Sequence, residues 1–489
     1  MNSIIKKALR KLKSQVQELA GQISRENLSP QTLSRFEHDL DESLGELGRS
    51  VETAVLEDAD IEKPAIEHDG QRHYWKYKGP QEYQCLFGKI EVRRSVYQAN
   101  GERTLCPLEV NAGILHHGLT PPAAEFVAYS TAHMVPGEVE KFCHKWQYLQ
   151  PCETVIKQVA AEVGEMAEVL QEQYEEEVHK QEGPPPPETK IVSISRDGTC
   201  VNTREDGWRQ AQVGAVTFYG ESTEVDKDGD PIRNRLRTTY VGQMPEESSE
   251  TFNPKFEQEV EHALDGVDDS SKIVCLADGA RSNWKYFEAH PRLKKAVHVN
   301  DYFHSAGYVN AAAEALFRKG TAEAKRWFEK YRRILKKEDG GAEKVMRSIR
   351  YFRASRKIRA KDRKKIISKA LGYFTRNRSR MNYAEYRRQG LPIGSGVVEA
   401  ACKTVVGHRF KRAGMRWSID GGQTILNLRV LVLSQRWETF WKCHEKTLSA
   451  TRVAAYCDTC THRRRSISRH EIHRGVQNPP LVRPQLHGR

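Results

Sequence analysis

IVSISRD at residues 191–197 and KIVCLAD at residues 272–278 are the two stretches on which the fold prediction rests. Each is an apolar run of strand length that ends in an aspartate, and a glycine follows each aspartate. Most of the eight Asp-Gly pairs in the chain are expected to be turns. These two differ, because Asp197 and Asp278 are expected at the ends of buried strands, where an open mixed sheet presents its ligands.

The elements that surround these stretches alternate in a definite order. Strands are expected at 208–220, 233–243 and 296–301, and helices at 253–264 and 283–290. Three meandering strands followed by strands flanked by helices are the order of a ribonuclease-H-like α/β fold. In that fold the first and fourth strands are neighbours, so Asp197 and Asp278 are expected to meet although 81 residues separate them.

A third carboxylate, Glu399, lies in PIGSGVVEAACK. Gly394 and Gly396 permit close backbone approach, and Glu399 falls in the first turn of a predicted helix with Lys403 four residues on. Neighbouring carboxylates repel one another unless a cation lies between them, so the trio predicts a site for Mg²⁺ or Mn²⁺. The alternative for Glu399 is an acid that complements a helix N-terminus.

Positive charge is concentrated in one segment of the chain. Residues 318–389 contain 26 Lys and Arg against 7 Asp and Glu, an excess of 19, whereas the whole chain carries a net charge of +13. Trp327, Tyr331 and Tyr351 are among the aromatic residues that interrupt these charges at roughly helical spacing. Such a surface fits a nucleic-acid backbone, because clustered Lys and Arg release condensed counterions. A solvated helical face with aromatic core residues is the alternative.

At 489 residues the chain is expected to form several domains. A tetraproline at 184–187 indicates a linker. The predicted units are a helical arm at 1–73, a β-hairpin region at 74–119, a helix-turn-helix-like DNA-binding unit at 120–183, the linker at 184–189, the catalytic domain at 190–440 with a basic helical insertion at 306–390, and a basic, disordered tail at 441–489. Any small helical bundle is the alternative for 120–183.

Further candidate residues flank the third acid. Asp301 and His304 lie three apart in VNDYFHSAGY, where they could share a helical face and assist the site, or simply be buried. Charged groups and one ring that could contact a DNA end are Lys403, His408, Arg409, Lys411, Arg412, Arg416 and Trp417. A buried ring is the alternative for Trp417.

The ten cysteines are scattered, which is typical of a reducing compartment. Cys457, Cys460, His470 and His473 are the right residue types for zinc, but their spacing is short for a finger, so a disordered tail is preferred there. The chain lacks an apolar run long enough to cross a membrane and lacks a signal-peptide core at its start. A cytoplasmic protein is therefore expected.

Three blocks of the sequence resemble bacterial insertion-sequence transposases of the ISKra type. They are SRDGT, LADGARSNWKYFEAHPRLKKAVHVNDYFH and PIGSGVVEAACKTVVGHRFKRAGMRWS, within a resemblance that covers roughly residues 75–440. The resemblance implies a DDE transposase with a ribonuclease-H-like domain in which Asp197, Asp278 and Glu399 are the catalytic acids. The run from Asp301 to His304 also resembles an Asp-x-x-His element of the related Mutator-like group. The resemblance to bacterial proteins further implies association with the nucleoid.

The resemblance and the residues together predict an enzyme that uses two Mg²⁺ ions to cleave and join DNA strands. Its expected partners are double-stranded DNA, as the terminal inverted repeats and the target, and a second copy of the chain in a synaptic complex. Two alternatives remain open at this point: a non-catalytic DNA-binding regulator derived from a transposase, and a ribonuclease-H-like nuclease or resolvase that cuts without joining.

Overall fold

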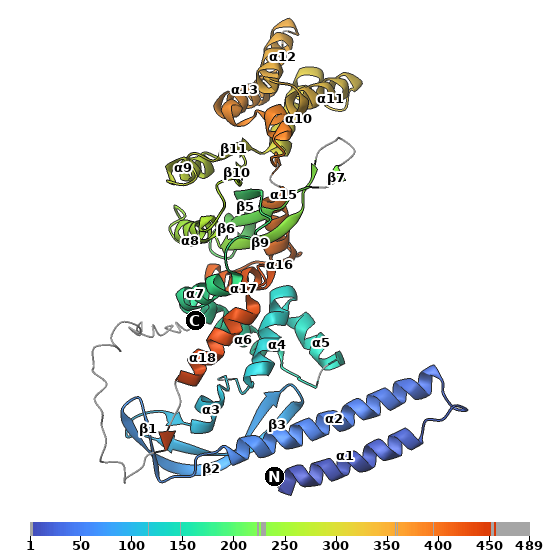
Figure 1. Ribbon diagram of the computed structural model, residues 1–489, viewed down its shortest axis with the longest axis vertical. Coiled ribbons are helices and arrows are strands. Elements are labelled where there is room, and N and C mark those ends of the chain that lie inside the picture. The colour runs from blue at the N-terminus through green and yellow to red at the C-terminus, as the bar shows by residue number, and fades with distance from the viewer. Residues whose placement is uncertain are drawn as a thin grey trace.

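The computed structural model describes residues 3–115, 117–146, 148–222, 224–225, 231–356, 358, 360–394, 396–450 and 454–455. The molecule is elongated (Figure 1). A helical cap lies at one end, a mixed sheet lies in the middle, and a helical bundle joins that sheet to a smaller sheet with a projecting helical hairpin. Cys457, Cys460, His470 and His473 lie outside the described residues, as does most of the predicted tail.

The amino-terminal arm is an antiparallel pair of helices, α1 (Ser3–Gly21) and α2 (Pro30–Asp58), as predicted. Ser29 caps α2 in a capping box with Thr32, and Pro30 occupies the first helical turn. The small sheet beside the arm has the order β12-β1-β2-β3-β4. Its strands are β1 (Ala65–His68), β2 (Gln71–Cys85), β3 (Gly88–Gln98), β4 (Thr104–Leu105) and β12 (Ala454–Ala455). The predicted hairpin is therefore confirmed, with Gly88 at φ 109° in its turn.

A helical bundle follows. Its members are α3 (Pro107–Ala112), α4 (Pro121–His133), α5 (Pro136–Trp146), α6 (Glu153–Val169), α7 (Gln171–Glu182), α17 (Ile419–Leu433) and α18 (Trp437–Ala450). Pro121 opens α4, and Pro136 lies in the first turn of α5. Helices α6 and α17 approach closely, because a Cβ at Gly164 would lie 2.6 Å from the carbonyl oxygen of Thr424. The predicted tail boundary at 441 is wrong, since α18 runs to Ala450 and buries Trp441 in the bundle core.

The central sheet mixes parallel and antiparallel strands in the order β11-β10-β5-β6-β9. Its strands are β5 (Ile191–Thr203), β6 (Gly207–Tyr219), β9 (Arg235–Gln243), β10 (Lys272–Ala277) and β11 (Val297–Asn300), and a separate ribbon pairs β7 (Glu224–Val225) with β8 (Pro231–Ile232). β5 pairs antiparallel with β6 and parallel with β10. The chain is thus a mixed α/β protein, as expected.

Two groups of helices cover the two faces of this sheet. Helices α8 (Phe252–Leu264) and α9 (Arg281–Ala289) pack on one face through Phe256, Val260 and Phe287. The other face carries Ile191, Val274, Leu276 and Val299 and packs against helices from the cap. Side chains alternate between the two faces along a strand. The residues named above therefore determine which face each later residue of β5, β10 and β11 occupies.

The predicted insertion at 306–390 is helical, and its first helix begins slightly earlier. The elements are α10 (Tyr302–Phe317), α11 (Ala322–Lys337), α12 (Gly341–Ser355), α13 (Lys361–Asn377), a 3₁₀ turn (Arg378–Arg380) and α14 (Tyr383–Arg388). Trp327 is buried and its indole nitrogen donates to Ser348, whereas Tyr351 is exposed. The aromatic residues of this segment therefore serve largely as its core, with the charges around them. None of the described helices is long and apolar enough to cross a membrane.

Candidate active site

The register of the central sheet brings three aspartates into one row. Leu276 pairs with Ser195 across β10 and β5, and Ala277 pairs with Asn300 across β10 and β11. Continuing this register places Asp278 beside Asp197 on one side and beside Asp301 on the other. Each of the three lies an even number of residues from Ile191, Leu276 or Val299 of its own strand, so all three belong to the face that packs against the cap helices. Neighbouring strands lie about 4.8 Å apart, so the predicted juxtaposition of Asp197 and Asp278 follows from the pairing.

One part of that prediction is wrong, because Asp197 does not end its strand. β5 continues to Thr203, and Asp197 and Gly198 pair with Val213 and Gln212 of β6. The Asp-Gly pair makes no turn here because β6 accompanies β5 along its whole length. The parallel pairing with β10 stops at Ser195, however. Asp197 therefore stands where one neighbouring strand has ended.

Asp278 is held firmly by the start of the helix that follows it. Its Oδ1 accepts hydrogen bonds from the Ala280 amide at 2.9 Å and from Asn283 Nδ2 at 3.1 Å. The indole nitrogen of Trp284 donates to the Asp278 carbonyl at 2.9 Å. A Cβ at Gly279 would lie 2.2 Å from the Tyr373 ring, so only glycine fits there. The sequence prediction missed Asn283, although it lies in the block that carries the family resemblance.

Asp197 carries the clearest electrostatic signature of the group. The pKa of Asp197 is raised to about 6, chiefly by burial and in addition by the charges of Asp278 and Glu399, while the Gly198 amide and His304 act in the opposite direction. The Gly198 amide donates to Asp197 Oδ1 at 2.7 Å, and Cys402 Sγ lies 3.9 Å from Oδ2. The influence of Asp278 and Glu399 on one carboxyl group indicates that the three predicted acids share a local environment.

Glu399 reaches this region from α15 (Gly396–Ala401), a short helix that contacts β5 and β6. The loop before it approaches α10 closely, because a Cβ at Gly394 would lie 2.6 Å from the Phe303 ring. α15 continues into a π-helix (Cys402–Gly407) and α16 (His408–Phe410). The buried Arg429 side chain donates to the carbonyl oxygens of Thr404 and Val405, which steadies this irregular turn.

Asp301 and His304 have different surroundings. Asp301 is fully buried and caps α10, because its side chain accepts a hydrogen bond from the His304 amide. The His304 side chain is exposed, and its ring lies 6.1 Å from the ring of Tyr373. The structure thus gives Asp301 a structural role at the end of the aspartate row, and it leaves His304 accessible near Asp197.

The basic residues after Glu399 divide into two groups. The exposed ones are Lys403, His408, Lys411, Arg412 and Arg416. Lys411 bonds to Thr199, two residues beyond Asp197, so this loop lies beside the acids. Arg412 pairs with Glu138 at 2.7 Å.

Arg409 and Trp417 are less exposed than these basic residues, and both line a groove together with Arg416. Arg409 is 2% exposed, donates to the Thr131 carbonyl at 3.2 Å and stacks over Trp417 at 5.0 Å. Burial, together with the neighbouring positive charges, lowers the pKa of Arg409 to about 10. Trp417 packs on Phe410 and donates to its carbonyl oxygen at 3.3 Å. Arg409 is therefore bound inside the protein, whereas Trp417 is partly buried against Phe410 and keeps part of its ring on the groove.

The acids suit a hard divalent cation, although they do not form a closed cage. All three offer carboxylate oxygens, which Mg²⁺ prefers, and Asn283 provides the outer hydrogen bond that orients Asp278. A different set of possible metal ligands lies closer together. Among the described residues, the ligand atoms of Glu257, Glu261 and His290 lie within 4.8 Å of one another.

The Glu257–Glu261–His290 group is better explained as an ion-pair cluster. Arg292 already binds Glu261 at 2.7 Å. The Arg292 amide also donates to His290 Nδ1 at 3.2 Å, which leaves the proton of a neutral ring on Nε2, facing the two glutamates. A metal ligand would need the lone pair at that nitrogen.

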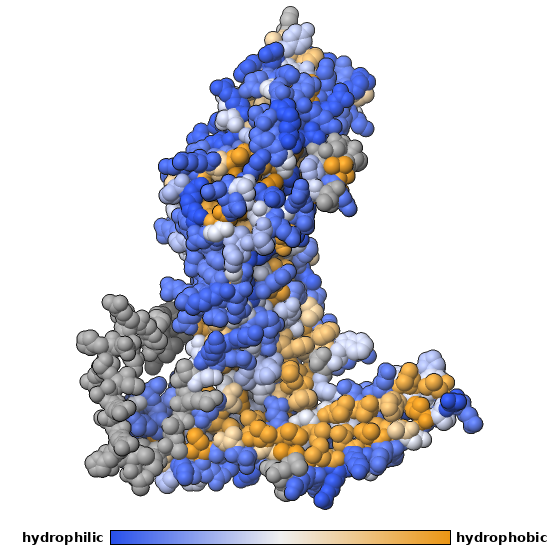
Figure 2. All heavy atoms as spheres, in the orientation of Figure 1, coloured by the Kyte–Doolittle hydropathy of each residue, from blue (hydrophilic) through white to orange (hydrophobic). Residues whose placement is uncertain are grey.

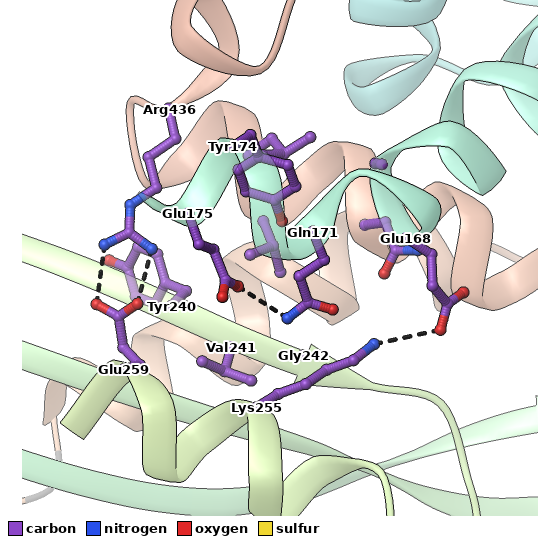
Figure 3. Close-up of a pocket in the computed structure, with 14 residues that line it drawn as sticks. Glu168, Gln171, Tyr174, Glu175, Tyr240, Val241, Gly242, Lys255, Glu259 and Arg436 are labelled. Carbon is purple, nitrogen blue, oxygen red and sulfur yellow. Dashed lines mark hydrogen bonds and ion pairs between the residues drawn. The ribbon is translucent and has the colours of Figure 1, made fainter. Parts of the chain in front are cut away.

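A further acidic group lies beside a small cavity between α7, α8 and the turn from α17 to α18 (Figure 3). Arg436 donates to Glu182 at 2.6 and 3.1 Å and to Glu259 at 2.7 and 3.0 Å. Burial alone would raise the pKa of Glu182, but His262 and Arg436 lower it to about 2. Glu175, on the same cavity, bonds to Gln171 at 2.8 Å, and burial raises its pKa to about 7. This is a charge-balanced internal cluster.

No protein-family model matches the sequence, and no curated protein matches it either. The geometry of the site and the chemistry of its residues therefore carry the functional argument.

Proposed function

We propose that this chain is a metal-dependent DDE transposase of the insertion-sequence type, which binds the ends of its element and cleaves and joins DNA strands. The strand order supports a ribonuclease-H-like catalytic domain, since β9, β6 and β5 form an antiparallel meander and β10 and β11 add parallel strands beside β5. The sequence resemblance in the blocks around the three acids supports the same class.

The observation that carries the proposal is the alignment of Asp197 with Asp278 in neighbouring parallel strands, with Glu399 close enough to shift the pKa of Asp197. These carboxylates would hold Mg²⁺ or Mn²⁺. The bound ions would neutralise charge on a scissile phosphate and favour a deprotonated oxygen nucleophile. With a pKa of about 6, Asp197 is ionised at neutral pH and available as a ligand.

The reaction is a displacement at phosphorus. The oxygen of water, or of a 3′ hydroxyl, forms a new bond to phosphorus, the bond to the leaving 3′ oxygen breaks, and the proton of the nucleophile passes to solvent. Water as nucleophile gives cleavage, and a 3′ hydroxyl as nucleophile gives joining. Asn283 keeps Asp278 oriented through both steps, and Lys403 and Lys411 offer positive charge to the DNA backbone beside the acids.

Two basic surfaces support DNA as the substrate. A groove on the cap is lined by Tyr302, Phe303, Glu329, Lys330, Arg332, Arg333, Lys336 and Lys337, and Phe303 packs against the Gly394 loop that leads to Glu399. A second groove includes Lys157 of α6 together with Arg204 and Arg416. Because Lys157 lies in the early part of α6, this groove also supports α4, α5 and α6 as a helix-turn-helix-like unit.

The test is a strand-transfer assay with purified protein, Mg²⁺ and oligonucleotides carrying the inverted repeats that flank the coding region. Wild-type protein is expected to yield cleaved and joined products. Asp278→Asn and Glu399→Gln are expected to lower both by at least about 100-fold while DNA binding persists. Glu172→Gln, the same change at an exposed glutamate of α7, is the matched control and should retain activity.

The alternatives give different results in the same assay. Cleavage that survives Glu399→Gln contradicts the assignment of the acids. Cleavage without joining identifies a nuclease or resolvase. Binding without any cleavage by the wild-type protein identifies a non-catalytic regulator.

A further inference from the structure

The α1–α2 hairpin presents apolar side chains that nothing in the described part of the chain covers fully. In α1, Ile5, Leu12 and Leu19 recur every seven residues, and in α2, Leu33, Leu44 and Val55 recur every eleven. Of the apolar residues of these helices, only Leu19 and Ala54 are buried. Figure 2 shows the resulting apolar band along the visible side of the hairpin. Repeats of seven and eleven residues are typical of helices that pack along their length against other helices.

The exposed positions lie on the arm, away from the centre of the molecule. Leu9 is 43% exposed, Leu33 is 42% exposed and Leu44 is 48% exposed. The second half of α2 is anchored to the body, because a Cβ at Gly48 would meet the Phe87 ring at 2.4 Å and Arg49 donates to the Phe87 carbonyl at 2.8 Å. The arm is thus a fixed projection (Figure 1).

The two helices of the arm carry opposite charge. α1 has five Lys and Arg and one acid, whereas α2 has two Arg and eight acids. A groove between them is lined by the acids Glu18, Asp39, Glu42 and Glu46, together with Gln15, Leu19, Gln22 and Ser43. Of the basic residues of α1, Lys11 is paired with Glu46 of its own hairpin, while Lys6, Lys7 and Lys13 are exposed. One hairpin therefore offers both an acidic groove and a basic amphipathic helix.

We propose that the α1–α2 hairpin is a dimerisation surface, occupied by the same hairpin of a second copy in an antiparallel four-helix bundle. The basic α1 of each copy would lie along the acidic groove of the other, and the exposed leucines would meet at the centre. In a dimer with a two-fold axis, each acidic groove would contact the basic α1 of the other copy, because the surface is complementary to itself. DNA does not suit this surface, since its phosphates would face the four carboxylates. The inference is independent of the proposed catalytic function.

The first test measures the mass of the full-length chain in solution without DNA, by light scattering coupled to gel filtration at about 1 to 50 µM, a range in which protein dimers commonly form. Wild-type protein is expected to elute with twice the mass of one chain. Leu9→Lys, Leu33→Lys and Leu44→Lys combined should give one chain's mass with an unchanged circular dichroism spectrum, since all three positions are exposed. Ile366→Lys, at a 41% exposed position on α13, is the matched control and should remain dimeric.

A charge exchange tests the partner directly. One variant carries Lys6→Glu, Lys7→Glu and Lys13→Glu, and the other carries Glu18→Lys, Asp39→Lys and Glu42→Lys. Each variant alone is expected to weaken dimerisation by at least about 10-fold, and an equimolar mixture should restore it as a heterodimer. A monomeric wild-type chain, or a dimer unaffected by the leucine changes, overturns the proposal. A mixture that stays monomeric shows that the grooves are not the contact and overturns it as well.

Discussion

Two groups of acids in this molecule differ in how their charge is balanced. Glu182 and Glu259 both form ion pairs with Arg436, so these two carboxylates have a cationic partner inside the protein. Figure 3 shows the pair of Arg436 with Glu259. Asp197, Asp278 and Glu399 meet at the end of parallel strands, where the charges of the last two raise the pKa of Asp197. The first cluster lowers the pKa of Glu182 to about 2, and the second raises that of Asp197 to about 6. The two groups therefore differ in the direction in which the protein shifts the pKa of a buried carboxyl group.

Removing one charge is expected to change the free energy of unfolding in opposite directions in the two groups of acids. Arg436→Met leaves two buried glutamates without their cation, so the free energy of unfolding should fall by about 3 to 5 kcal/mol. Urea unfolding at pH 7.5 measures the change. Arg412→Met removes an exposed pair with Glu138 and should cost at most about 1 kcal/mol. Equal losses in the two variants would show that the internal cluster is not special.

Asp197→Asn should act in the other direction. An acid whose pKa is raised in the folded state destabilises the protein progressively as the pH rises from its ordinary pKa of 3.8 to the folded value of about 6. At pH 7.5 in EDTA, removal of that charge should raise the free energy of unfolding by about 1 to 3 kcal/mol. At pH 3.5 the variant and the wild type should be equally stable. Destabilisation at pH 7.5 would show that the acids are internally compensated after all.

The smallest expected effect is stabilisation by Mg²⁺, and it distinguishes the predicted metal site from the Glu257–Glu261–His290 group. At pH 7.5, 10 mM Mg²⁺ should stabilise the protein by about 1 kcal/mol, seen as a rise of a few degrees in the melting temperature. The rise should shrink at pH 5, where Asp197 is largely protonated, and disappear in Asp197→Asn. Glu257→Gln should keep it. A rise that is lost in Glu257→Gln but kept in Asp197→Asn would move the metal site to the Glu257–Glu261–His290 group.

Much of the fold could be predicted because it depends on local patterns. Pro121 opens a helix, and β-branched runs form the strands that begin at 191 and 272. The proximity of Asp197 and Asp278 also followed, since strand order fixes which strands are neighbours. The strand end at Asp197 was wrong, because an Asp-Gly pair forms no turn when a long partner strand accompanies it.

Side-chain roles were harder to predict. Arg409 was expected at the surface, but it packs on Trp417 and donates to the carbonyl oxygen of Thr131, which lies more than two hundred residues away in the chain. Asn283 and Cys402 contact the two aspartates only because the sheet and the helices after it converge there. Asp301 caps a helix, and this depends on where β11 ends relative to α10.

The sequence by itself determined the order of strands and helices, the location of the positive charge and the pairing that brings Asp197 near Asp278, because these depend on residue type and short-range spacing. The tertiary structure decided which cationic side chains are buried and which are exposed to solvent. Three buried arginines donate hydrogen bonds to internal carboxylates and carbonyl oxygens, namely Arg436, Arg429 and Arg409. By contrast, Lys403 and Lys411 are exposed near the acids. Burial and pairing of a charge depend on every group that surrounds it, and that information is not local in the chain.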